Sequence, residues 1–214
     1  MPGDDVRDEI LAKIRAATGR PSGGPPPQPP KPLLTVPEVP LEERIEQFSA
    51  ALEKLSGKAH VAESAEAARA LVEELITGRS AIASNSPLLR EYGITSLTGV
   101  FTGYTDAAEL KEACASADVG ITGADYALAD TGSLVTLSAP GEARLISLLP
   151  PVHIALVPKQ RLLTGLDELF TLLPDPAAQT SSMVIITGPS RTADIEQILV
   201  KGVHGPRMVH AILV

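Results

Sequence analysis

Apolar residues recur along this chain in two alternating patterns. Short continuous apolar runs, typical of buried strands, are separated by stretches with an apolar residue every three or four positions, typical of amphipathic helices. We predict strands at 60–62, 81–83, 94–100, 119–122, 133–137, 152–157, 183–186 and 208–214. Predicted helices cover 6–17, 41–55, 64–76, 86–92, 106–115, 142–149, 166–173 and 193–200. This alternation indicates an α/β fold with an open, mainly parallel, doubly wound sheet.

A proline-rich stretch divides the chain. Nine of the 19 prolines fall between positions 21 and 40, and such a sequence favours an extended polyproline tether over a helix or a ladder of strands. An SH3-type ligand is the alternative meaning of such prolines. We therefore predict an N-terminal helical appendage at 1–20, a linker at 21–40 and one α/β domain at 41–214. The appendage has three possible docking sites: its own domain, a second copy of the chain, or another subunit.

Composition narrows the function classes. The net charge is −8, which disfavours nucleic acid as a partner, and no apolar run approaches the ~20 residues of a membrane span. The N-terminus lacks the apolar core of a signal peptide, so we expect a cytoplasmic protein. Cys114 is the one cysteine. We expect it to be a buried apolar residue, and we expect this chain to bind no iron–sulfur cluster.

The turn Gly188-Pro189-Ser190-Arg191-Thr192 carries the strongest candidate chemistry. It follows a predicted strand and precedes the predicted helix 193–200, whose free N–H groups and positive dipole end would face a ligand. Gly188 allows close backbone approach, Ser190 and Thr192 offer hydroxyl donors, and Arg191 can fork onto a carboxylate or phosphate. These features predict a small-anion site. The alternative is a capped helix with Thr192 as N-cap and Arg191 in solvent.

A second polar loop joins this hypothesis. Thr131, Gly132 and Ser133 lead into a predicted strand, where their hydroxyls suit either anion binding or simple turn capping. Arg144 is the second candidate for charge pairing. Because ligands of open α/β sheets bind beyond the carboxyl ends of strands, these residues are candidates for one site.

His204 lies between Val203 and Gly205-Pro206 after the predicted helix. A histidine held by such a backbone suits a positioned acid or base, and we take it as the tentative catalytic residue. The alternative is a hydrogen bond to a helix C-terminus. No histidines and carboxylates occur at local ligand spacing, so we predict no metal site.

Four blocks occur in order: 131–134, 144–154, 188–196 and 202–206. Together they resemble the LUD family of lactate-utilisation proteins, strongly over the second half of the chain and loosely from about residue 41. The resemblance implies a fold related to the NagB/RpiA/CoA-transferase group. It also implies iron–sulfur partner subunits that support oxidation of L-lactate to pyruvate.

Within such a system this chain would bind a small carboxylate or organise the complex, and a homo-oligomer is possible. Two alternatives stay open. The first is a stand-alone enzyme of the CoA-transferase or phosphosugar-isomerase kind, for which Glu142 is the candidate nucleophilic glutamate because it adjoins a glycine turn. The second is a non-catalytic interaction protein.

Overall fold

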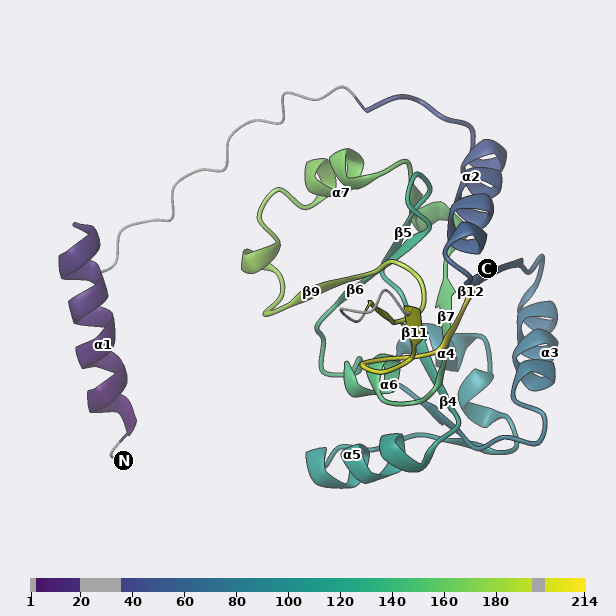
Figure 1. The fold of residues 1–214 in the computed structure, drawn as a ribbon, viewed down its shortest axis with the longest axis horizontal. Coiled ribbons are helices and arrows are strands. Elements are labelled where there is room, and N and C mark those ends of the chain that lie inside the picture. The colour runs from purple at the N-terminus through teal and green to yellow at the C-terminus, as the bar shows by residue number, and fades with distance from the viewer. Residues whose placement is uncertain (1–2, 20–35, 194–198) are drawn as a thin grey trace. The chain divides into compact units, whose positions relative to one another are not determined.

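The computed structural model describes the backbone of residues 3–19, 36–193 and 199–214 (Figure 1). The chain forms two compact units, Met1–Lys31 and Pro32–Val214. The first contains helix α1 (Gly3–Thr18), which leaves an apolar stripe of Val6, Ile10 and Ile14 exposed. The boundary between the units falls inside the predicted linker, much of which lies outside the described residues. The division at 20 and 40 therefore stays a prediction.

The larger unit is built on a six-stranded, fully parallel sheet. Its order is β1 (Lys58–Val61), β12 (Met208–Leu213), β7 (Val152–Val157), β4 (Val119–Gly123), β2 (Ala81–Ala83) and β3 (Val100–Phe101). The chain order and the spatial order differ, as expected when helices connect parallel strands. The predicted α/β class with a mainly parallel sheet is confirmed.

Helices cover both faces of this sheet (Figure 1). They are α2 (Leu41–Lys54), α3 (Ala65–Leu75), α4 (Pro87–Glu91), α5 (Ala107–Ser116) and α6 (Leu145–Leu148), whereas α7 (Leu166–Leu172) packs on the second sheet described below. Short 3₁₀ turns are η1 (Ile94–Ser96), η2 (Lys159–Arg161) and η3 (Pro176–Ala178). Helix α3 begins where predicted, because the Ser64 hydroxyl accepts a hydrogen bond from the Ala67 N–H.

Alternate residues of the central strands feed two separate cores. On one face, Ile154 and Ile212 pack with Val72 of α3. On the other face, Ala211 packs with Phe48 of α2. These side chains are fully buried, and each large one stabilises the fold by about 1.5–3 kcal/mol relative to an exposed position.

A second sheet adjoins the core on the α2 side. It comprises β8 (Leu162–Leu163), β5 (Tyr126–Leu128), β6 (Ser133–Leu137) and β9 (Met183–Ile186), in that order. The strands predicted at 133–137 and 183–186 are thus present, but they pair antiparallel with each other and lie outside the parallel sheet. Strand β5 was not predicted. It forms because residues 126–128 pair antiparallel with β6 across the short turn that holds Thr131–Ser133.

The C-terminal region differs from the sequence prediction at 193–200. Strand β10 (Arg191–Ala193) pairs antiparallel with β11 (Leu199–Lys201), so the predicted helix is wrong at residues 193, 199 and 200. Residues 194–198 lie outside the described part of the chain. An apolar pattern as short as this one fits a strand as well as a helix. The pairing of β10 with β11 gives the backbone groups of both strands hydrogen-bond partners. The helix predicted at 142–149 is also shorter, because the Glu142 N–H closes a turn onto the Ala139 carbonyl before α6 begins.

Candidate functional site

Ser133 links the first predicted polar loop to the chain just before the second one. Ser133, which is buried at the start of β6, donates from Oγ to Thr131 Oγ1 over 2.8 Å. The same Ser133 oxygen lies 2.9 Å from Thr187 Oγ1, directly after β9. Ser133 therefore bonds to both threonines, and the loop 131–133 meets the chain at Thr187, the residue just before the predicted turn 188–192.

Both loops pack against the C-terminal part of α2. Gly132 has φ +65°, and a Cβ at this position would lie 2.8 Å from the Cα of Leu52. Gly188 has φ +80°, and a Cβ there would lie 2.9 Å from the Cβ of Leu55. Each glycine is needed for its left-handed backbone and for the space that α2 occupies. Close approach does occur at both glycines, but the approaching group is a helix of the same chain.

Arg191 is engaged by the same helix. Its Nη2 donates to the Leu55 carbonyl oxygen, the C-cap carbonyl of α2, and to Ser56 Oγ at 3.2 Å. A guanidinium at this point satisfies a helix carbonyl and complements the negative end of the helix dipole. Since Arg191 begins a strand, the argument that placed it at a helix N-terminus is wrong. Its role toward an anion stays a prediction.

The remaining members of the predicted set lie in different places. The Ser190 N–H donates to the Pro206 carbonyl over 2.9 Å, so this backbone donor is not free for a ligand. The side chain of Thr192 lies outside the described residues. Arg144 is exposed and donates from Nη1 to Ser182 Oγ over 3.2 Å. His204 is exposed in a groove beside α6.

A cleft of about 420 Å³ with both apolar and charged residues in its lining lies at the carboxyl ends of β2, β4 and β7. Ser86 follows β2, Gly123 ends β4 and Pro158 follows β7. Three carboxyl groups line the cleft, from Glu91, Asp125 and Glu142. This is the position at which open α/β sheets bind ligands, and it is the best candidate for a functional site in the described part of the chain.

Glu142 reaches this cleft from the turn before α6. Its Oε1 accepts a hydrogen bond from the Gly123 N–H over 3.2 Å. A Cβ on Gly123 would lie 2.8 Å from this oxygen and 2.8 Å from Ser86 Oγ. The bare glycine therefore lets a carboxylate and a hydroxyl approach the end of β4 together. Ser84, two positions before Ser86 in the chain, is buried, and its hydroxyl has no hydrogen-bond partner.

Burial shifts the pKa of both Glu142 and Asp125. It raises the pKa of Glu142 above its ordinary value, and the hydroxyl of Ser86 opposes that rise. Burial likewise raises the pKa of Asp125, although this carboxylate accepts a 2.7 Å hydrogen bond from the Leu137 N–H. The exposed Arg161 lies near Asp125 and partly offsets the rise, with its guanidinium 5.7 Å from the Tyr126 ring centroid. Acids with raised pKa beside one cation can exchange protons with a polar ligand.

A buried pair of polar side chains lies inside the sheet, between β4 and β7. His153 is fully buried on β7, and its Nε2 lies 2.9 Å from Thr122 Oγ1 on β4. Burial lowers the pKa of His153 to about 4, so the ring is neutral at pH 7. Its Nδ1 has no partner. His153 is thus a buried histidine that is hydrogen-bonded inside the sheet.

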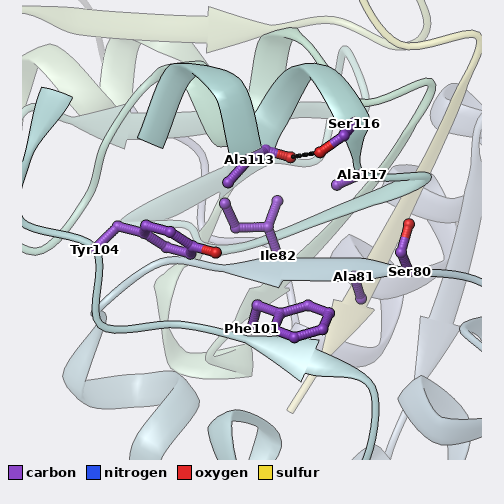
Figure 2. A pocket seen from close by; sticks show the side chains of 8 residues that line it. All are labelled: Ser80, Ala81, Ile82, Phe101, Tyr104, Ala113, Ser116 and Ala117. Carbon is purple, nitrogen blue, oxygen red and sulfur yellow. Dashed lines mark hydrogen bonds between the residues drawn. The ribbon is translucent and has the colours of Figure 1, made fainter. Parts of the chain in front are cut away.

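A cavity of about 230 Å³ lies between the edge of the parallel sheet and α5 (Figure 2). Ile82, Phe101 and Tyr104 are the large side chains among those that line it, as Figure 2 shows. The Ser80 hydroxyl donates to Asp118, and the Ser116 hydroxyl bonds to helix carbonyls. The serine hydroxyls of this cavity are therefore already hydrogen-bonded within the protein. A site for a polar ligand needs unpaired polar groups that point at one place, so this cavity is a weaker candidate than the cleft.

Two features are absent from the described residues: a metal-binding group of side chains and a membrane-spanning helix. Within them, no three His, Cys, Asp or Glu side chains are grouped to hold a metal ion. None of the described helices is both long and apolar enough to cross a membrane.

The fold and the cleft define an open α/β protein with a candidate site at the carboxyl ends of its parallel strands. The LUD domain profile matches residues 45–214, and the chain belongs to the LUD domain family. A lactate utilization protein C from Halalkalibacterium halodurans is 39% identical over 143 residues, which cover 63% of this chain and 62% of that protein. The lactate utilization protein C of Bacillus subtilis is 36% identical over 153 residues, covering 64% of this chain and 63% of that protein. The matched part thus spans less than two thirds of these relatives.

A solved structure shares the fold. The crystal structure of a DUF162 family protein from Deinococcus radiodurans aligns with a TM-score of 0.62 and 19% identity. The alignment covers 83% of this chain and 99% of that one. At this identity the likeness concerns the fold alone. The more specific relation to the NagB/RpiA/CoA-transferase group stays a prediction.

Proposed function

We propose that this chain acts in lactate utilisation as a subunit that binds a small carboxylate and carries no cluster of its own. Its relatives bear the name lactate utilization protein C, and the family match covers most of the chain. In this proposal, iron–sulfur partner subunits in the cytoplasm accept the two electrons released when L-lactate becomes pyruvate. Organising that complex is the second part of the same role.

The observation that carries the ligand-binding role is the cleft beyond β2, β4 and β7. It combines a partly buried Glu142, which can accept a hydrogen bond from a ligand hydroxyl, with an exposed Arg161, which can pair with a ligand carboxylate. A 2-hydroxy acid offers both groups. Both arginines are hydrogen-bonded within the chain: Arg161 donates once, from Nη1 to the Asp125 carbonyl over 3.4 Å, whereas Arg191 bonds to both Leu55 and Ser56 at the end of α2.

Ligand binding to the purified full chain tests the proposal. The melting temperature should rise when L-lactate or pyruvate is added, because a ligand that binds the native state stabilises it by RT ln(1 + [L]/Kd). Arg161→Ala should abolish the shift, whereas Arg90→Ala, a change at an exposed arginine of α4 outside the cleft, should leave it intact. If Arg191→Ala abolishes the shift and Arg161→Ala does not, the anion site lies at the turn predicted from the sequence.

Acyl transfer is the second candidate, and the partial burial of Glu142 in the cleft favours it. An ionised Glu142 would attack an acyl-CoA carbonyl and release the CoA thiolate, forming an acyl–glutamyl anhydride. The thiolate would then attack the glutamyl carbonyl and release the acid, leaving a glutamyl–CoA thioester. Incubation with acetyl-CoA followed by mass spectrometry tests this. A CoA adduct on the peptide containing Glu142 would support transfer, and an unmodified peptide would exclude it for that donor.

A further inference from the structure

The loop that carries His204 forms one wall of a groove that the proposed site does not use. The opposite wall is α6 and the turn after it, and the groove has a volume of about 520 Å³. Leu145, Leu148, Leu149 and Val203 supply its apolar surface. Leu148 and Leu149 are each 44% exposed and Val203 is 53% exposed. Clustered exposed apolar side chains of this kind mark interaction surfaces more often than isolated ones do.

The groove is held in shape by backbone hydrogen bonds. The Arg207 N–H donates to the Pro151 carbonyl over 2.8 Å, and the Gly202 N–H donates to the Ser190 carbonyl over 3.0 Å. Pro206 is buried, and its carbonyl accepts the Ser190 N–H. Because this backbone is already ordered, binding a partner costs it little conformational entropy.

Arg207 is positioned at the rim of this groove by a glycine. Gly202 has φ +79°, and a Cβ on it would lie 3.0 Å from both Cδ and Nε of Arg207. The stem of Arg207 therefore lies over the bare α-carbon of Gly202. A guanidinium whose stem is packed in this way loses less rotamer freedom on pairing with a carboxylate.

The charge of the groove is opposite to that of the whole chain. The chain has 26 acidic and 18 basic residues. Among the described residues that line the groove, none is acidic, and Arg207 and His204 carry its polar groups. We propose that this groove docks an amphipathic helical segment of another protein, with apolar side chains between α6 and Val203 and a carboxylate on Arg207. The inference does not depend on the lactate-binding cleft.

Fluorescence anisotropy with three labelled helical peptides tests the proposal on the full chain. The peptides share one leucine stripe and differ only in carrying Glu, Gln or Lys beside it. We expect the Glu peptide to bind at least about tenfold more tightly than the Lys peptide, as one charge-assisted contact provides. Arg207→Glu should reverse this order. Leu148→Ser should weaken binding of all three peptides.

Arg90→Glu is the matched control, because it makes the same charge change on an exposed residue outside the groove. Circular dichroism melts should confirm that every variant is folded. Equal affinities for the three peptides, or an unchanged order in Arg207→Glu, would overturn the proposal. So would a homodimer in sedimentation equilibrium that Arg207→Glu dissociates, because the groove would then belong to a second copy.

Discussion

The guanidinium of Arg191 bonds to the carbonyl oxygen of Leu55, so an arginine singled out for ligand binding instead closes the C-terminal end of α2. The contact joins segments 136 positions apart in the sequence. Together with Gly132 and Gly188, it fixes α2 against the second sheet. The most distinctive sequence blocks of the chain thus meet at one helix end.

Replacing Arg191 with Ala should lower the free energy of unfolding by about 1 kcal/mol. A bond from a charged donor contributes about 1.5–3 kcal/mol, and the exposure of Arg191 reduces that value. Urea unfolding measures the change. Arg90→Ala, at an exposed arginine outside this cluster, should have an effect near zero. Equal effects of the two variants would show that the contact with α2 adds no stability.

Gly132→Ala should destabilise the protein far more than Gly78→Ala does. Both glycines have positive φ, +65° and +72°, so both variants incur the left-handed backbone cost of about 1–2 kcal/mol. Only at Gly132 would the new methyl group meet the α2 backbone, whereas nothing lies within 4 Å at Gly78. Overpacking adds about 1–3 kcal/mol. Comparable unfolding midpoints for the two variants would contradict the close approach of α2.

Stability should fall as the pH drops from about 6.5 to about 4. Burial lowers the pKa of His153 and of His210 to about 4 in the folded state, below the ordinary value of 6.5. The unfolded chain therefore binds more protons in this window, and each histidine contributes a slope of up to about 1.4 kcal/mol per pH unit. Urea unfolding between pH 7.5 and pH 4.5 measures the slope.

His210 also hydrogen-bonds to His60, with Nδ1 3.0 Å from Nε2. His210→Gln should make the pH profile shallower, while the exposed His204→Gln should leave it unchanged. A profile that does not depend on His210 would assign the acid sensitivity to other groups.

Deleting residues 1–38 should leave a folded domain. Contacts within Pro32–Val214 form a compact unit, and the core clusters begin at Leu41. The melting temperature should therefore change little, because none of the described residues of the removed segment, 3–19 and 36–38, belongs to those clusters. An insoluble or molten product would show that the N-terminal segment belongs to the core.

Local signals explain which elements the sequence predicted. The strands around Ile121, Ile154 and Ile212 are short apolar runs, and Ser64 marks the start of α3, so each carries its own evidence. The paired strands β10 and β11 do not, because their apolar pattern is too short to separate the strand period from the helix period. The pairing of β6 with β9 joins distant segments, and only the folded sheet decides it.

The cleft was harder to predict for a related reason. Glu142 adjoins a glycine turn, but its burial depends on Gly123 and Ser86, which come from other loops of the sheet. Neither distant partner is visible in the local sequence. Tertiary packing therefore assembles this cleft, whereas the Arg191 turn could be found from its own sequence.

Glu142→Gln should raise stability at pH 7 and weaken lactate binding together. Burial raises the pKa of Glu142, so the folded state disfavours the carboxylate, and that cost is present at every pH above the folded pKa. Glutamine keeps an oxygen for the Gly123 N–H and removes the charge. Binding weakens because a neutral amide accepts a hydrogen bond from a ligand hydroxyl less strongly than a carboxylate does.

Urea unfolding at pH 7 and pH 4 separates these effects from simple repacking. The gain of Glu142→Gln over the unsubstituted chain should shrink at pH 4, where Glu142 is protonated in the folded protein. Glu91→Gln, at another glutamate that lines the cleft on α4, is the matched control for the loss of a carboxylate. Gains that are equal at both pH values would mean that the charge of Glu142 does not oppose folding. The cleft would then lack the ionised acid that the proposed ligand contact requires.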